Sequence, residues 1–171
     1  TIVRHVGDIG RMVDEFSAFA RMPAPLMAPA DLKKLLTDTV GLQRGAFPHI
    51  DFALDVPPQD VIARCDGRQI GQAITNILKN AVEAVDTKHG SESKARKGSV
   101  SVRLFADAEK VDIVLTDDGI GLPQAERYKL TEPYVTTRAK GTGLGLAIVK
   151  KIVEDHRGTL TLADAPSGGA I

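Results

Sequence analysis

The sequence predicts an α+β fold preceded by one long helix of a bundle or coiled coil. Apolar residues recur at helical spacing in three segments after residue 30, and they alternate with polar residues in shorter segments between them. The first twenty residues carry a stricter apolar repeat of 3.5 residues. With 171 residues, 43% of them hydrophobic, the chain is long enough to bury one core and carry a short extra element.

The opening helix is predicted from apolar positions that step by 4, 3, 4, 3 and 4 residues: Ile2, Val6, Ile9, Val13, Phe16 and Ala20. A helix with this seam needs partner helices, because it cannot bury the seam alone. It ends at Met22-Pro23-Ala24-Pro25, since proline cannot continue a helix. We therefore expect a helix over 1–22, a linker and candidate hinge over 23–30, and a domain over 31–171.

The domain is predicted to contain helices over residues 31–45, 67–85 and 143–156, the first capped by the Asp31 carboxylate. Strands are predicted over residues 50–56, 61–65, 99–105, 111–116 and 159–162. Residues 87–98 are polar and bounded by glycine, which predicts a flexible loop. Residues 122–140 show no clean period, and a loop of that length is usually functional or mobile.

Charge and cysteine content exclude several classes of protein. Basic and acidic residues both number 22, so nothing suggests general binding to nucleic acid or contact with a membrane surface. The single cysteine, Cys65, excludes an internal disulfide and a CxxC metal site, and a reducing compartment fits. The sequence has no run of about 18 apolar residues. We expect this chain to be cytoplasmic.

The first polar cluster interrupts the apolar face of the predicted helix over 67–85. Asn76 and Asn80 are four residues apart and share one face, and Lys79 lies one step aside, where it can reach a phosphate. Asparagine is a poor residue for a helix interior, and its amide oxygen is a hard ligand that suits Mg²⁺. A pair of buried asparagines tied to a neighbouring loop explains the pattern equally well.

The second cluster, Asp117-Asp118-Gly119-Ile120-Gly121, directly follows a predicted apolar strand. A carboxylate at a strand end can accept a hydrogen bond from an exocyclic amine such as that of adenine. The glycines Gly119 and Gly121 let the backbone approach a flat ligand. An ordinary tight turn is the alternative, because such sequences are common in turns.

The third cluster, Gly141-Thr142-Gly143-Leu144-Gly145, opens the last predicted helix. Glycine-rich backbone that leads into a helix N-terminus favours anions, because free N–H groups point outward and the helix dipole is positive there. The dinucleotide fingerprint G-x-G-x-x-G would need glycine where Leu146 stands, and the P-loop pattern is absent.

The three clusters, in this order and with a long lid before the third, resemble the Bergerat-type ATP-binding domain. Members of that family include histidine kinases, DNA gyrase, heat-shock chaperone ATPases and anti-sigma-factor kinases. The resemblance implies a two-layer α/β sandwich, in which helices cover one face of a mixed sheet. It also implies ATP and Mg²⁺ as ligands, and an ATP lid over about 122–140.

The resemblance also assigns roles to single residues. Asp117 would bind adenine, while Gly119 and Gly121 let the backbone close on the base. Asn80, with help from Asn76, would hold Mg²⁺ on the phosphates. The cations expected to contact phosphate are Lys79 and Arg138, and Lys79 and Asn76 are the expected catalytic residues. Backbone N–H groups of the last helix would contact the phosphates from Thr142, Gly143, Leu144 and Gly145.

One position favours phosphoryl transfer over hydrolysis. Hydrolytic members of the family carry a glutamate four residues before the asparagine of this motif, where it activates water. With Asn80 as that asparagine, the glutamate's position is filled by Asn76, which cannot act as a general base.

Three further stretches resemble sensor histidine kinases of the nitrogen-regulation NtrY type: residues 7–16, 19–23 and 132–137. The resemblance implies that residues 1–22 are the second helix of the dimerisation and phosphotransfer hairpin. The acceptor motif H-E-[IL]-x-N-P of the first hairpin helix is absent, so no self-phosphorylation is expected, and His5 is expected to lie on the surface. The implied partners are a response regulator resembling NtrX and a second copy bound through the hairpin, in a full-length protein anchored in the bacterial inner membrane.

Two other functions stay open from the sequence. A serine kinase of the anti-sigma-factor type shares the fold, although the bundle seam before Pro23 argues against it. A nucleotide-responsive dimerisation module without activity is the other alternative.

Overall fold

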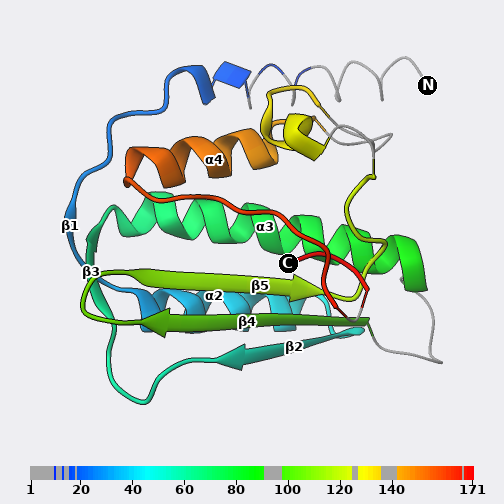
Figure 1. Ribbon diagram of the computed structural model, residues 1–171, viewed down its shortest axis with the longest axis horizontal. Helices are drawn as coiled ribbons and strands as arrows, with labels where there is room; N and C mark the ends of the chain where they lie inside the picture. The colour runs from blue at the N-terminus through cyan, green and yellow to red at the C-terminus, as the bar shows by residue number, and fades with distance from the viewer. Residues whose placement is uncertain are drawn as a thin grey trace.

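A computed structural model describes residues 10, 13, 16–17, 19–90, 98–124, 127–135, 142–166 and 168–171. Figure 1 shows a sheet packed against helices, with a further helix, α4, beside α3 and the N-terminal segment beyond α4. The described residues between Gly10 and Ala20 are helical, as the apolar repeat predicts, and the chain turns at Arg21.

The main sheet is mixed and has three strands in the order β2-β4-β5. Strand β2 (Ile50–Asp55) pairs in parallel with β4 (Gly98–Ala106), and β4 pairs antiparallel with β5 (Val111–Asp117). Buried and exposed residues alternate along β2 and through most of β4. One face of the sheet is therefore covered and the other faces solvent, which is the predicted two-layer arrangement.

A second, two-stranded sheet joins the start of the domain to its middle. Strand β1 (Ala28–Asp31) pairs antiparallel with β3 (Ile62–Cys65), so that Ala28 lies opposite Cys65. The sequence predicts β3 but not β1, because proline and alanine residues there hide the strand signal. Residues 28–30, expected to be linker, thus take part in a sheet of the domain.

Three helices carry the domain: α2 (Leu32–Ala46), α3 (Gly67–His89) and α4 (Gly145–Asp155). The carboxylates of Asp31 and Asp66 cap the first two by accepting backbone N–H groups. Helix α3 runs one turn beyond the prediction, to His89, with Gly90 as its C-cap, so residues 87–89 of the predicted loop are helical. Residues 91–97 of that predicted loop lie outside the described residues, and Gly98 begins β4. A short 3-10 helix, η1 (Arg127–Thr131), lies within the predicted lid.

The main core lies between α2, α3 and the sheet, and its most deeply buried side chains are Leu36, Val40, Leu78, Val85 and Val102. A smaller core joins α3 to α4, and Phe19 and Met22 pack against it from the N-terminal segment. Helix α3 therefore packs against the sheet and α2 through the main core, and against α4 through the smaller core.

The predicted strand over 159–162 is wrong, because those residues form no strand. Backbone hydrogen bonds instead join Ala163 to Ile171, and an isolated bridge joins Asp164 to Ala170. A strand needs a hydrogen-bonded partner strand, and the alternation of apolar and polar residues in a short segment does not show whether such a partner exists.

Candidate nucleotide-binding site

The asparagine face of α3 lies against the beginning of α4. Asn76 Nδ2 donates to the carbonyl oxygen of Gly145 across 3.4 Å, a long hydrogen bond. A Cβ built on Gly145 would lie 3.9 Å from Asn80 Nδ2. The fold thus brings the first and third clusters together, although they are 69 residues apart in sequence. The Asn76 bond leaves its amide oxygen as the atom that can ligate a cation.

Asp117 is the last residue of β5, and its carboxylate is buried and held in place. Its Oδ1 accepts the backbone N–H groups of Gly119, at 2.8 Å, and Ala170, at 3.3 Å. The backbone N–H of Asp117 donates to the Ala170 carbonyl oxygen at 2.9 Å. A buried carboxylate with fixed orientation can discriminate between donors and acceptors on a ligand, because an unmatched buried group costs free energy.

The turn after Asp117 lies directly on α3. A Cβ on Gly119 would come within 2.6 Å of the Ala84 carbonyl carbon, so only glycine allows this approach. The backbone N–H of Ile120 donates to the Ala84 carbonyl oxygen at 3.2 Å. Ala84 follows Asn80 by one turn of helix, about 6 Å along the axis. One stretch of α3 therefore faces both the carboxylate cluster and the glycine-rich cluster.

The glycine-rich cluster is covered by the end of the described lid. Gly143 has a φ of 70°, and a Cβ there would lie 2.6 Å from the carbonyl carbon of Tyr134. The Tyr134 N–H donates to the Gly143 carbonyl oxygen at 3.1 Å. The lid and the loop thus touch at a position where the backbone requires glycine.

The first turn of α4 presents backbone N–H groups rather than a side-chain cap. Its N-cap residue, Leu144, is fully buried and makes no side-chain capping bond. Uncapped N–H groups at a helix start can bind phosphate oxygens. Gly145 is the first residue of this turn, half-buried Thr142 precedes it, and Lys79 is exposed on α3. Arg138 and Gly141 lie outside the described residues.

The sequence reasoning missed two sets of contacts at the site, one made by the C-terminal segment and one made by Asp118. The segment Gly168–Ala170 packs on Asp117, and Gly121, with a φ of 77°, lies against Gly169. Asp118 fastens the same turn: its Oδ1 accepts from Ser99 N at 2.9 Å, and its carbonyl oxygen accepts from Lys88 Nζ at 2.7 Å. The only sequence signal was the Gly168-Gly169 pair, which does not reveal its distant partner.

The residues fit a magnesium ion carried by phosphates better than an ion held by protein alone. Within the described parts of the chain, no group of three or more His, Cys, Asp or Glu residues could hold a metal. The amide oxygens of Asn76 and Asn80 are hard donors, and Mg²⁺ commonly combines one or two protein ligands with phosphate oxygens and water.

A cavity of about 310 Å³ lies on a different face of α4 and contains none of the predicted site residues. It is lined by Phe19, Thr131, Glu132, Pro133, Ala147, Lys150, Lys151, Glu154 and Asp155. It is therefore separate from the candidate nucleotide site.

Comparisons with known proteins agree with this geometry. The profile of the family described as histidine kinase-, DNA gyrase B- and HSP90-like ATPase matches residues 65–171, which hold all three clusters. The chain belongs to this ATPase family. The predicted α+β sandwich is the fold of the solved relatives, and ATP is the nucleotide that the family name implies.

The chain is similar to nitrogen regulation protein NtrY of Azorhizobium caulinodans, with 51% identity over 98% of this chain. It spans only 21% of the length of that relative. A mycobacterial sensor histidine kinase, MprB, is 31% identical, with a TM-score of 0.67 over 85% of this chain and 93% of the solved chain. Full-length ShkA, solved in complex with AMPPNP, is 26% identical, with a TM-score of 0.77 over 99% of this chain and 36% of the solved one.

Proposed function

We propose that this chain is the ATP-binding catalytic domain of a sensor histidine kinase of the NtrY type. The main observation behind this proposal is that one helix, α3, contacts both other clusters. Asn76 and Asn80 lie against the start of α4, and Ala84 lies against the turn after Asp117. Family membership and the likeness to NtrY support the proposal, as does the likeness to ShkA, whose structure holds the ATP analogue AMPPNP.

Asp117 is proposed to bind the adenine base. Its carboxylate can accept a hydrogen bond from the 6-amino group, whereas guanine presents a carbonyl oxygen there. Gly119 and Gly121 keep side chains away from the base, and the contact of Gly119 with Ala84 sets the depth of the turn. Fixed donors on Oδ1 hold the carboxylate before any ligand arrives.

The phosphates are proposed to lie between the asparagine face and the first turn of α4. The backbone N–H groups of Thr142, Gly143, Leu144 and Gly145 would contact them, with Lys79 and Arg138 as cations. Asn80, helped by Asn76, would hold Mg²⁺, which neutralises phosphate charge when bound. Asn76 and Lys79 thus act by positioning and electrostatics, the main contributions in phosphoryl transfer.

The reaction proposed is transfer of the γ-phosphoryl group to a histidine outside residues 1–171. The histidine nitrogen forms a bond to the γ-phosphorus, the bond to the bridging oxygen breaks, and ADP leaves. The phosphoryl group would then pass to an aspartate of a response regulator resembling NtrX. A site that lacks a carboxylate base four residues before Asn80 is poorly suited to hydrolysis.

The rest of the protein is proposed from the same likeness. Residues 1–22 would be the second helix of a dimerising hairpin, and the full-length protein would be a homodimer anchored in the bacterial inner membrane. Among the residues described here, no helix is both long and apolar enough to cross a membrane. The domain over 31–171 would then work on the cytoplasmic side.

The test is to mix the purified chain, γ-labelled ATP and Mg²⁺ with a separately produced hairpin that carries the acceptor histidine. The expected product is acid-labile phosphate on the hairpin, and a hairpin with histidine replaced by alanine is the control. Acid-stable phosphate on an added serine substrate would favour the anti-sigma-factor type of kinase instead. ATP binding without transfer to either acceptor would favour a nucleotide-responsive dimerisation module.

A further inference from the structure

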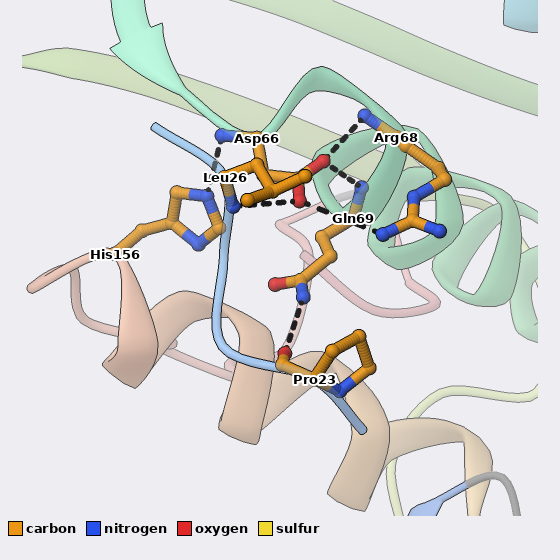
Figure 2. A network of polar contacts seen from close by, with 6 residues as sticks. All are labelled: Pro23, Leu26, Asp66, Arg68, Gln69 and His156. Atoms are coloured by element: carbon orange, nitrogen blue, oxygen red, sulfur yellow. Dashed lines mark hydrogen bonds and ion pairs between the residues drawn. The ribbon is translucent and has the colours of Figure 1, made fainter. Parts of the chain in front are cut away.

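The linker after the N-terminal helix is attached to the start of α3 by a buried amide (Figure 2). Gln69 is only 3% exposed, and its Nε2 donates to the Pro23 carbonyl oxygen at 2.9 Å. Glutamine is usually exposed, and a buried amide is costly unless it is hydrogen-bonded. Its Oε1 has no partner within the described part of the chain, so the bond to Pro23 is the amide's main compensation.

Asp66 attaches the same linker at a second point. Its Oδ1 caps α3 by accepting from Arg68 N and Gln69 N, at 3.1 and 3.2 Å, while Oδ2 accepts from Leu26 N at 3.0 Å. In Figure 2 the linker runs past the start of α3, with Leu26 beside Asp66 and Pro23 at the Gln69 amide. The Asp66 carboxylate therefore caps α3 with one oxygen and holds the linker with the other, and capping alone would need only the first.

His156 connects this attachment to the end of α4 (Figure 2). Its Nε2 accepts the Asp66 backbone N–H at 2.9 Å, so its Nδ1 carries the proton and donates to the Ile152 carbonyl oxygen at 2.7 Å. Only the neutral Nδ1–H tautomer satisfies both partners. The opposite end of α4 begins at Gly145, beside Asn80. One helix thus links the candidate nucleotide site to Asp66, the residue that holds the linker.

The linker is also held by packing of the residues before it and by strand pairing at its end. Phe19 and Met22 pack on the small core of α3 and α4, whose buried members include Val149 and Ile152. At the end of the linker, β1 pairs with β3 along four residues. The segment between these contacts has little freedom to bend.

We propose that Pro23–Leu26 is a docked strap, positioned by Asp66 and Gln69, that fixes the N-terminal helix against the domain. The strap replaces the free hinge that the prolines suggest. The docking is independent of activity. Its relevance to signalling, through the connection that His156 and α4 make to the candidate nucleotide site, rests on the proposed kinase function. Asp66, Gln69 and His156 are positioning residues, because the contacts described for them are with the strap, their own helices and one another.

The test measures the distance between spin labels on the N-terminal helix and on α2, without nucleotide. Labels go on Val13→Cys and Leu42→Cys, whose parent residues are 55% and 74% exposed, in a Cys65→Ala background. Leu26→Pro removes the N–H that Asp66 accepts, and Leu26→Ala is its matched control, because the Leu26 side chain is 77% exposed. Gln69→Leu removes the donor to Pro23, and Gln72→Leu, at an exposed position of the same helix, is its matched control.

We expect one narrow distance distribution in the parent and in both controls, and at least a doubling of its width in Leu26→Pro and Gln69→Leu. Circular dichroism should stay unchanged, which separates positioning from unfolding. If Gln69→Leu does not fold, Leu26→Pro decides alone, because it lies outside the core. A broad distribution in the parent, or a narrow one in Leu26→Pro, would overturn the proposal. Because no nucleotide is present, a failure to bind ATP would count only against the proposed function.

Discussion

Gly169 leaves space for Asp117: a Cβ on Gly169 would lie 2.0 Å from the Asp117 carbonyl oxygen and 2.9 Å from its Oδ1. Gly169 also has a φ of 94°, a conformation that side chains rarely adopt. The residue proposed to bind adenine is thus positioned by a glycine 52 residues later, whose neighbour Ala170 donates to the same carboxylate.

Gly169→Ala should therefore weaken ATP binding by displacing Asp117. We expect a loss of at least about tenfold, which corresponds to about 1.4 kcal/mol. Isothermal titration with Mg·ATP measures it. Gly45→Ala is the control, because no atom would contact its Cβ in α2, and it should bind ATP like the parent. Equal affinity in both variants would contradict the positioning role.

Asp117→Asn should reduce the preference for ATP over GTP. The amide keeps the size of the carboxylate but can present a donor to guanine's carbonyl oxygen. An unmatched buried group costs about 1–3 kcal/mol, so the preference should fall by about one order of magnitude or more. Competition binding with the two nucleotides measures the ratio. An unchanged ratio of ATP to GTP affinity would mean that a residue other than Asp117 determines the preference for adenine.

Asn80→Ala should weaken Mg·ATP much more than metal-free ATP. The reason is that the amide oxygen is proposed as a metal ligand, so its loss matters chiefly when the metal is present. Titrations with Mg²⁺ and with EDTA provide the comparison. Equal weakening in both would argue for contact with the nucleotide itself. Thr75→Ala, one residue before the asparagine face, serves as a control, because its hydroxyl bonds only to Gly71 among the contacts described.

Stability should depend on Asp66 at acid pH. The Leu26 N–H, followed by the N–H groups of α3 and the Arg68 cation, holds the pKa of this carboxyl below its ordinary value, although burial opposes the shift. A lowered folded-state pKa gives stability that is complete above the unfolded pKa of about 3.9 and is lost as pH falls through the lowered value.

Asp66→Asn keeps a capping oxygen but removes this charge. The parent should exceed it in free energy of unfolding above about pH 5, and the difference should shrink below about pH 4. Urea denaturation at three pH values measures this. A difference that is constant with pH would assign the effect to packing.

The chain alone should bind ATP without phosphorylating itself. None of its four histidines lies in the H-E-x-x-N-P setting of an acceptor, and His156 is committed on both ring nitrogens. Incubation with γ-labelled ATP should leave the protein unlabelled. Acid-labile phosphate on His5 would overturn this expectation and the assignment of the first helix.

Local patterns predicted the helices well because their signals are local. Asp31 and Asp66 precede apolar periodicity, and both cap helices in the structure. Asn76 and Asn80 were placed on one face by spacing alone, and they do share it. By contrast, β1, the contact of Gly169 with Asp117 and the attachment of Pro23 to Gln69 depend on residues distant in sequence. Periodicity carries no information about such pairs. The prediction of a strand over 159–162 failed for the same reason, because a strand depends on a partner elsewhere in the chain.

The proposed docked strap determines where this domain can be joined to a foreign helix. A chimaera that joins a foreign input helix to this domain at Asp31 would discard β1 and leave the Asp66 and Gln69 side chains without Leu26 and Pro23. A junction before Phe19 would keep the whole attachment, including the packing on α4. The exchangeable unit is therefore the domain together with the last turn of the helix that precedes it.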